Sequence, residues 1–400
     1  MNILVLCQYY YPEPFRITDI CETLVSEGHE VTVLTGLPNY PEGRVLDDYR
    51  SGKKRNEIIK GVRVIRSFEI GRGHSKSRLF LNYFSFSISA SIKALFIKEK
   101  FDVIFVNQLS PVMMAIPAIA YKKKHKTKIL LYCLDLWPDS LLAGGIKDNS
   151  IIYRAFLKLS KWIYNSADTI LVTSSMFREY FEKVLDIKAT DIKHLPQYAE
   201  DLFTKSAIIT KNDDIMNFVF AGNIGDMQSV ETIIKAANEL KGHPEIVFHI
   251  IGDGSKLEEC KELANDFNLK NITFYGRRPV SEMPNFYGMA DAMLITLKDN
   301  KALSYTLPGK VQSYLAAGKP IVGAINGETR QVIEDADCGL CCDAEDYKSL
   351  SQLALDFCKS DKGEKMTANS KKFYLENYSK SKFIESLERE LVNLEAKAHV

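Results

Sequence analysis

Residues 307–323 read LPGKVQSYLAAGKPIVG, and this stretch is the most informative segment of the chain. Its pattern predicts a helix over residues 310–317, preceded by a Pro-Gly pair and followed by a short strand over residues 321–323. Free N–H groups and the positive end of the helix dipole would then face a ligand. Lys310 stands at that end, where a bound phosphate would explain a cation that the dipole otherwise disfavours. The alternative for Lys310 is a solvated side chain.

Short β-branched runs alternate with helical patterns through most of the chain. Strands are expected at residues 2–6, 30–34, 62–66, 102–106, 128–134, 169–173, 217–221, 246–251, 272–275, 292–296 and 321–323. Helices are expected at residues 17–26, 79–97, 111–122, 151–164, 229–240, 255–267, 281–288, 310–317 and 328–335. This alternation predicts an α/β fold with two Rossmann-like domains, each a doubly wound parallel sheet.

A polar stretch at residues 204–214 interrupts the alternation and marks the predicted domain boundary. We therefore expect one domain at residues 1–200 and a second at 201–380. Ligands of such sheets bind outside the carboxyl ends of the strands, so two facing domains would hold them in an inter-domain cleft. An apolar stripe at residues 381–396 predicts a helix, within the segment 381–400, whose length suits a crossing back to the first domain. The alternative is a helix that caps its own domain.

The composition excludes several classes of protein. The 400 residues are 46% apolar and 26% charged, as in globular proteins, and the net charge of +1 argues against a nucleic-acid-binding surface. The first ten residues lack a basic segment, so no signal peptide is expected, and Asn82 and Lys93 argue against a membrane-spanning helix in the apolar run 79–96. The eight cysteines are expected to be buried free thiols, because Cys338-x-x-Cys341 has no partner pair for zinc.

Two loops after predicted strands carry chemical signals. Residues 8–16 read QYYYPEPFR and lack the G-x-G-x-x-G pattern, which disfavours a dinucleotide there. This aromatic, proline-rich loop with Arg16 is typical of a surface that binds an acceptor, although a rigid packed loop is the alternative. The glycines of GNIG at residues 222–225 would let backbone N–H groups approach an anion.

Seven segments, in this order along the chain, carry a resemblance to a known family. They are GHEVTVLTG (28–36), PNYPEG (38–43), DLWPDS (135–140), ADTILVTSS (167–175), FAGNIG (220–225), IGDG (251–254) and LPGKVQSYLAAGKPIVG (307–323). Over nearly all of its length the chain resembles a retaining GT-B glycosyltransferase, similar to glycosyltransferase family 4. The pairing of PNYPEG with DLWPDS resembles the branch that builds bacterial surface polysaccharides, including the amino-deoxysugar transferases.

The resemblance implies an acceptor-binding first domain and a second domain that binds a nucleotide-sugar donor. The residues it assigns to the nucleotide and diphosphate are Gly222, Asn223, Gly225, Arg277, Arg278, Val280, Gly309, Lys310 and Ser313. The residues it assigns to the donor sugar are Ser304, Tyr305, Thr306 and Leu307. The residues it assigns to the acceptor are Tyr9, Tyr10, Tyr11, Arg16, Asn39, Tyr40 and Trp137.

The chain departs from the family pattern at a pair of glutamates that often stand eight positions apart. The corresponding positions are Tyr305 and Ser313, and neither is acidic. The ribose and donor-sugar contacts of those glutamates would then pass to hydroxyl groups of Ser304, Thr306 or Ser313.

Catalysis is expected to rest on Asp135 and Lys310. The family often has a histidine after the strand at 128–134, where this chain has Leu134 followed by Asp135, for which helix capping or a salt bridge is the alternative. The resemblance implies retention of configuration, by front-face transfer or, less favoured, by double displacement through Asp135. No metal or cofactor is expected, since Asp335-Ala336-Asp337 is the only Asp-x-Asp and is predicted to be a surface turn. Lys310 and helix N-termini would stabilise the departing diphosphate.

The partners implied are a nucleotide-sugar, with UDP as the preferred base, and a saccharide acceptor carried on a polyprenyl diphosphate. The run Lys122–Lys124 and the apolar helix at 79–97 would dock on an anionic membrane, which gives a cytoplasmic, peripheral location; a solvated edge is the alternative. Two other functions remain open, a sugar-nucleotide epimerase of the same fold and a non-catalytic sugar-nucleotide-binding protein.

Overall fold

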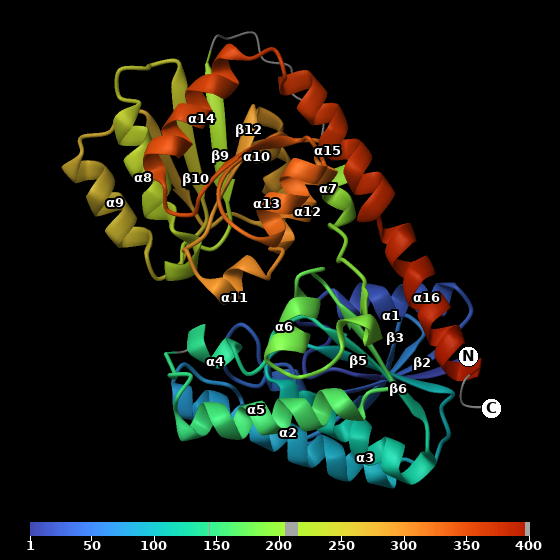
Figure 1. The fold of residues 1–400 in the computed structure, drawn as a ribbon. Helices are drawn as coiled ribbons and strands as arrows, with labels where there is room; N and C mark the ends of the chain where they lie inside the picture. Colours follow the sequence, from blue (N-terminus) through green and yellow to red (C-terminus); the bar gives the residue numbers. More distant parts are fainter. Residues whose placement is uncertain (144, 205–214, 397–400) are drawn as a thin grey trace. The chain divides into compact units, whose positions relative to one another are not determined.

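The computed structural model describes residues 1–143, 145–204 and 215–396 (Figure 1). The chain divides into two compact units. The first contains Met1–Thr173, Phe177–Leu195 and the residues from Ile384 onward. The second contains Ser174–Met176 and Pro196–Phe383. Most of the polar stretch predicted to mark the boundary, residues 205–214, lies outside the described residues.

An eight-stranded sheet forms the centre of the first unit. Its order is β3-β4-β2-β1-β5-β6-β7-β8, and every neighbouring pair is parallel except the β3–β4 hairpin. The strands are β1 (Asn2–Leu6), β2 (Glu30–Thr35), β3 (Asn56–Ile59), β4 (Val62–Arg66), β5 (Val103–Gln108), β6 (Lys128–Cys133), β7 (Thr169–Val172) and β8 (Ile192–His194). All six residues of β5 are buried, as expected for a parallel strand with both faces covered.

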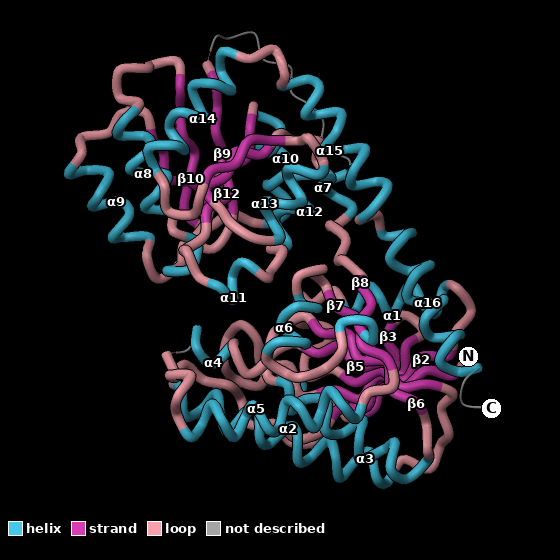
Figure 2. Tube along the Cα trace, in the orientation of Figure 1, coloured by secondary structure: helices cyan, strands magenta, loops and turns pink. Residues whose placement is uncertain are grey.

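Helices cover both faces of this sheet (Figure 2). They are α1 (Ile17–Ser26), α2 (Lys76–Phe96), α3 (Ile116–His125), α4 (Ser140–Ala143), α5 (Ile151–Ser166) and α6 (Phe177–Lys183), with 3-10 turns η1 (Asp47–Tyr49), η2 (Val112–Ala115) and η3 (Ala189–Asp191). The α5 helix shows how the sequence dictates packing. The Ser150 hydroxyl caps its N-terminus, and Tyr153, Phe156 and Ile163 form the buried stripe.

A six-stranded, wholly parallel sheet forms the centre of the second unit, in the order β11-β10-β9-β12-β13-β14. The strands are β9 (Met216–Ala221), β10 (Ile246–Ile251), β11 (Ile272–Gly276), β12 (Ala292–Thr296), β13 (Ile321–Ala324) and β14 (Gly339–Cys342). The helices and 3-10 turns are α7 (Asp201–Thr204), η4 (Asp226–Gln228), α8 (Val230–Glu239), α9 (Leu257–Asp266), η5 (Val280–Glu282), α10 (Met283–Met289), α11 (Lys301–Ser304), α12 (Gly309–Ala316), α13 (Glu328–Asp335), α14 (Tyr347–Lys359), α15 (Gly363–Asn377) and α16 (Lys380–Ala396).

In each sheet the strand order reverses beside the first strand of its unit. In the first sheet β1 lies between β2 and β5, and in the second β9 lies between β10 and β12. Ligands of open α/β sheets bind at such a switch point, outside the carboxyl ends of the strands. The loops that follow β1 and β9 are therefore the places to look for the site.

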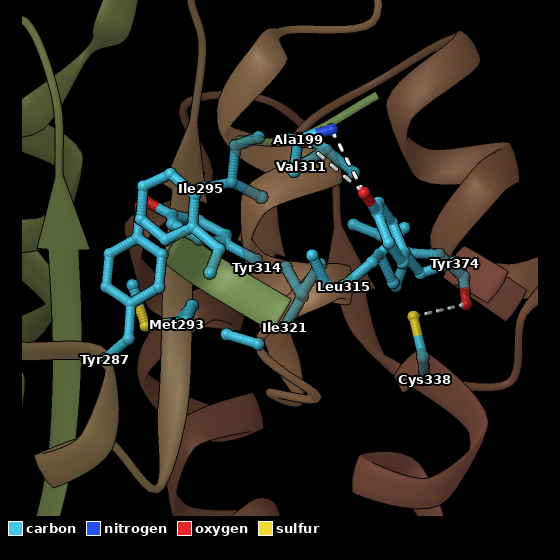
Figure 3. Close-up of a cluster of buried hydrophobic side chains, with 14 of the residues drawn as sticks. Ala199, Tyr287, Met293, Ile295, Val311, Tyr314, Leu315, Ile321, Cys338 and Tyr374 are labelled. Carbon is cyan, nitrogen blue, oxygen red and sulfur yellow. Dashed lines mark hydrogen bonds between the residues drawn. The ribbon is translucent and has the colours of Figure 1, made fainter. Parts of the chain in front are cut away.

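The α12 helix packs into one of the two apolar clusters of the second unit. Its buried residues Val311, Tyr314 and Leu315 contact strand residues such as Ile295 and Ile321 (Figure 3). The Tyr314 hydroxyl also donates to the Ala221 carbonyl at 3.1 Å, at the end of β9. This packing fixes the start of α12 relative to the loop after β9.

The final helix α16 begins in the second unit, and its residues from Ile384 onward belong to the first. There Glu388 accepts a hydrogen bond from His29 at 2.8 Å, and Glu390 pairs with Lys193. Phe383, Leu387, Leu391 and Leu394 are buried.

Three strands absent from the sequence-based prediction are β3, β8 and β14. Each is three or four residues long and lies at or next to an edge of its sheet, so its pattern is too short to stand out. The predicted helix at residues 111–122 is instead the 3-10 turn η2 followed by α3.

Candidate functional site

A cavity of about 710 Å³ opens at the carboxyl edge of the second sheet. It lies among the loops after β9, β10 and β11 and the start of α12. Its lining residues are Glu200, Phe203, Ala221, Gly222, Asn223, Ile251, Gly252, Asp253, Gly254, Arg277, Arg278, Val280, Met283, Tyr287, Lys310 and Ser313. Seven residues predicted to bind the donor nucleotide thus share one cavity, whereas Gly225 and Gly309 do not line it.

Glycines form one wall of this cavity because no side chain would fit there. A Cβ atom on Gly252 would lie 1.8 Å from the Gly222 carbonyl oxygen, and one on Gly222 would lie 2.8 Å from the Lys310 Nζ. Both glycines also have positive φ angles, of 142° and 153°. The absence of side chains at these two glycines therefore lets the loops after β9 and β10 and the Lys310 side chain pack closely at the wall of the cavity.

Lys310 points its ammonium nitrogen into the protein rather than into solvent. The nitrogen is buried, lies 4.0 Å from the centre of the Phe220 ring, and has no hydrogen-bond partner among the described residues. Burial alone lowers the pKa of Lys310 to about 7. An unpartnered amine at this depth is costly in the free protein, and an anion in the cavity would supply its partner. The alternative of a solvated lysine is therefore wrong.

The other predicted donor residues differ in their exposure and contacts. Arg277 and Val280 lie on the open side of the cavity, and Val280 is 59% exposed. The Arg278 Nε donates to the Tyr275 carbonyl at 3.2 Å, which ties the loop after β11 to its own strand. The Ser313 hydroxyl donates to the Gly309 carbonyl at 3.3 Å, within α12.

The four residues predicted to contact the donor sugar do not line the cavity. Tyr305 and Leu307 are buried. The Ser304 and Thr306 hydroxyls donate to carbonyls of their own helical turn, at Asn300 and Leu303 respectively. These hydroxyls therefore have local partners rather than an open binding surface in this structure.

The predicted acceptor residues gather at the carboxyl edge of the first sheet. Tyr11 and Tyr40 are exposed. The Tyr40 ring contacts Phe15, with 5.2 Å between ring centres, and Phe15 stacks on Tyr9 at 4.9 Å. Arg16 precedes α1 as its N-cap residue. The rings of Phe15 and Tyr40 thus offer an aromatic surface.

The other predicted acceptor residues are buried rather than exposed at this edge of the sheet. Tyr9, Tyr10, Asn39 and Trp137 are each at most 3% exposed. The Trp137 Nε1 donates to the Ser110 hydroxyl at 2.9 Å, and that hydroxyl donates to the Asp135 carboxylate at 2.7 Å. Burial raises the pKa of Asp135, while the Ser110 hydrogen bond opposes the shift. Among the described residues, Asp135 is thus held by the Ser110 hydroxyl and by no salt bridge.

Two buried glutamates that the sequence analysis did not single out hold the loops at this edge. Glu13 accepts backbone hydrogen bonds from Asn39 at 2.9 Å and from Tyr40 at 2.8 Å, and burial raises its pKa to about 7. Glu69 accepts from the Gln8 side chain at 2.8 Å and from Asn39 at 3.2 Å, and burial raises its pKa to about 8. A glutamate just after a buried strand was the only signal available for Glu69.

The basic run at residues 122–124 is largely engaged within the first unit. Lys122 donates to Asp168 at 2.5 Å, and the Lys124 amine donates to the carbonyls of Leu95 and Ile97 at the end of α2. Lys123 is exposed. Two of the three lysines therefore have structural partners.

The α2 helix exposes a long apolar stripe. Its exposed members are Leu81, Phe84, Ile88, Ile92, Leu95 and Phe96, which are 44–78% accessible. Among the residues described, α2 alone is long and apolar enough to cross a membrane by length and composition, a test that core helices of soluble proteins also pass. Only 28% of its most apolar window is buried.

The cysteines and the Asp-x-Asp segment can be compared with the sequence-based expectations of free thiols and a surface turn. All eight cysteines are free thiols, and six are buried. In the described part of the chain, no group of three or more His, Cys, Asp or Glu is arranged to hold a metal ion. Asp337 pairs with Lys365 at 2.7 Å on the surface.

Family models match both halves of the chain. Residues 16–197 match the model described as Glycosyltransferase Family 4, and residues 203–373 match Glycosyl transferases group 1. The probable glycosyltransferase WbjE of Pseudomonas aeruginosa is 27% identical over 62% of this chain and 64% of its own length, so the match spans less than two thirds of that protein. The glycosyl transferase WcaI of Escherichia coli, ascribed to colanic acid biosynthesis, is 24% identical over 80% of this chain and 82% of its own.

Solved structures of the GT-B class share the fold. HepE from Anabaena in complex with UDP aligns with a TM-score of 0.72 over 98% of this chain and 100% of its own, at 13% identity. The predicted GT-B architecture of two parallel-sheet α/β domains is thereby confirmed.

Proposed function

The chain belongs to the glycosyltransferases, with a family 4 domain followed by a group 1 domain, and we propose that it moves a sugar from a UDP-linked donor to a lipid-linked saccharide. The sugar we propose is an N-acetylated amino or deoxyamino sugar, and the pathway is the synthesis of capsule, O-antigen or exopolysaccharide. The name of WcaI, which refers to colanic acid, and the UDP held by HepE support this choice.

The observation that carries the proposal is the buried amine of Lys310 beside the glycine wall. A nucleoside diphosphate carries two negative phosphates joined by one oxygen, and the cavity offers the Lys310 cation, which has no hydrogen-bond partner in the described ranges. Backbone N–H groups at the start of α12 supplement that charge. The remaining cavity, lined by Arg277, Val280 and Tyr287, has room for a nucleoside.

The mechanism we propose is front-face transfer with retention of configuration. The bond between the anomeric carbon and the diphosphate oxygen breaks, and the acceptor hydroxyl forms its bond to the same face of that carbon. The hydroxyl proton passes to the departing diphosphate, whose charge Lys310 stabilises, so no protein nucleophile is required. Double displacement would require Asp135 to attack as a carboxylate. The Asp135 carboxylate is already engaged by the Ser110 hydroxyl at 2.7 Å, which favours the front-face route.

We also propose that the first unit rests on the cytoplasmic face of an anionic membrane. The helices α2, α3 and α5 lie on one side of its sheet (Figure 1) and contain no Asp or Glu, while together they carry nine Lys and Arg residues. The α5 helix also exposes large apolar side chains, Ile151, Ile152 and Trp162, each at least 43% exposed. An apolar stripe on helices that carry Lys and Arg but no Asp or Glu suits a surface of anionic lipid, where a polyprenyl-linked acceptor would be found.

The test is a product assay with UDP-, GDP- and dTDP-sugars in the presence and absence of lipid-linked saccharides. Acceptor-dependent release of UDP supports the proposal. Isomerised donor without transfer would identify an epimerase, and tight binding without turnover would identify a non-catalytic sugar-nucleotide-binding protein. Trapping of a glycosyl adduct on Asp135 would overturn the front-face mechanism.

A further inference from the structure

Arg72 is a half-buried cation at the carboxyl edge of the first sheet, and it has no acidic partner in the part of the chain that the structure describes. Its guanidinium lies 5.4 Å from the centre of the Tyr40 ring. Its backbone N–H donates to the Asn39 side chain at 3.0 Å, so the loop that carries it is anchored to the buried amide network. Among the described residues, no carboxylate lies within salt-bridge distance of it, although unpaired cations are usually left fully in solvent.

Two further arginines lie near this loop, Arg44 in the loop before η1 and Arg78 in the first turn of α2. The Gly73 N–H donates to the Gly43 carbonyl at 2.7 Å, which joins the segment carrying Arg72 to the segment carrying Arg44. The Arg78 side chain lies along Gly73, because a Cβ atom there would be 3.0 Å from the Arg78 Cβ. Within the described ranges, neither Arg44 nor Arg78 has an ion-pair partner.

The nearest buried carboxylates already have partners. Glu13 and Glu69 accept hydrogen bonds from backbone and side-chain amides, and Asp135 accepts one from Ser110. The positive charge of Arg72 is close enough to oppose the rise that burial causes in the pKa of Tyr83. These loops therefore present uncompensated positive charge beside the exposed ring of Tyr40.

We propose that Arg72, flanked by Arg44 and Arg78, binds an anionic group of the acceptor, either the diphosphate of a lipid carrier or the carboxylate of an acidic sugar. The planar guanidinium matches the paired oxygens of both groups, and the exposed part of the Tyr40 side chain, which is 36% accessible, offers a contact for a sugar ring. This inference rests on the proposed function, since it assigns the acceptor of that reaction. It makes Arg72 a specificity-determining residue that selects charged acceptors over neutral ones.

The test uses the full chain with its donor cavity saturated by UDP, so that a second anion cannot bind there. Geranyl diphosphate, sodium glucuronate and glucose are titrated separately, with intrinsic tryptophan fluorescence and calorimetry as readouts. The variants are Arg72→Gln, Arg72→Lys and, as a control on the same unit, Arg63→Gln, whose side chain pairs with Glu99.

We expect at least one of the two anions to bind, and Arg72→Gln to weaken that binding tenfold or more. Arg63→Gln should bind the anion as the unaltered chain does. Glucose should not bind. Binding of geranyl diphosphate but not glucuronate would identify the anionic group of the acceptor as a lipid diphosphate. Binding of glucuronate but not geranyl diphosphate would identify it as the carboxylate of an acidic sugar. Equal affinity in Arg72→Gln and the unaltered chain, or no binding of either anion, would overturn the inference. UDP affinity measured on the same samples separates this outcome from a failure of the proposed donor site.

Discussion

At the scale of single residues, Lys310 couples donor binding to pH. Its pKa is lowered to about 7 in the free protein because the amine is buried, and a diphosphate beside it would raise that pKa again. At a pH between the pKa of Lys310 in the free protein and its pKa in the UDP complex, binding of UDP is accompanied by the uptake of one proton. The affinity for UDP should therefore be at its maximum below pH 7 and should fall by up to about tenfold per pH unit above pH 7.

Calorimetry at pH 8 in buffers of different ionisation enthalpy measures this proton uptake directly. Lys310→Arg, which stays charged throughout this range, is the control and should show a flatter profile. A pH-independent affinity in the unaltered chain would contradict the assignment of the proton to Lys310.

The sequence predicted a phosphate-binding role for Lys310 but could not predict its burial. The Pro-Gly pair and the helix start are local signals, whereas the contact with Phe220 joins residues 90 positions apart. The same limit explains why the buried glutamates Glu13 and Glu69 were missed. Their partners come from several different segments, which no local pattern connects.

At the scale of elements, the apolar stripe of α2 should bind lipid. Phe84→Ser combined with Ile88→Ser removes two large side chains that are 44% and 60% exposed, so the fold should lose little stability. Because each buried apolar side chain contributes about 1.5–3 kcal/mol, the pair should weaken binding to anionic liposomes by tenfold or more.

Sedimentation with liposomes of anionic and of neutral lipid measures this effect. Ile58→Ser, at a residue that is 77% exposed on β3, is the matched control and should bind as the unaltered chain does. Equal sedimentation of the double variant, or binding that ignores lipid charge, would contradict the docking proposal.

Element boundaries followed from the sequence wherever a pattern was long. The ends of β1, α1, β4, β10, β12 and α13 agree with the predicted ranges. The basic run 122–124 could not be interpreted from sequence, because the Lys122 and Lys124 partners lie on other elements.

At the scale of the whole molecule, donor binding should involve one unit directly. Hydrogen exchange with and without UDP should show protection at residues 222–225, 252–254 and 308–313, which surround the cavity or begin α12. The loop at residues 8–16 lies in the other unit and should keep its exchange rate when UDP alone is added. Protection confined to the first unit would contradict the placement of the donor site.

The central claim is that the cavity holding Lys310 binds the donor diphosphate, and UDP affinity in a charge-removing variant tests it most directly. Lys310→Met keeps the length and apolar contacts of the side chain, and losing a charge-assisted contact costs about 1.5–3 kcal/mol, or about 10- to 150-fold in Kd. Lys241→Met is the control, because Lys241 also lies over a phenylalanine ring in this unit but outside the cavity. We predict that UDP binding by calorimetry weakens at least tenfold in Lys310→Met alone; an unchanged Kd in that variant would contradict the account.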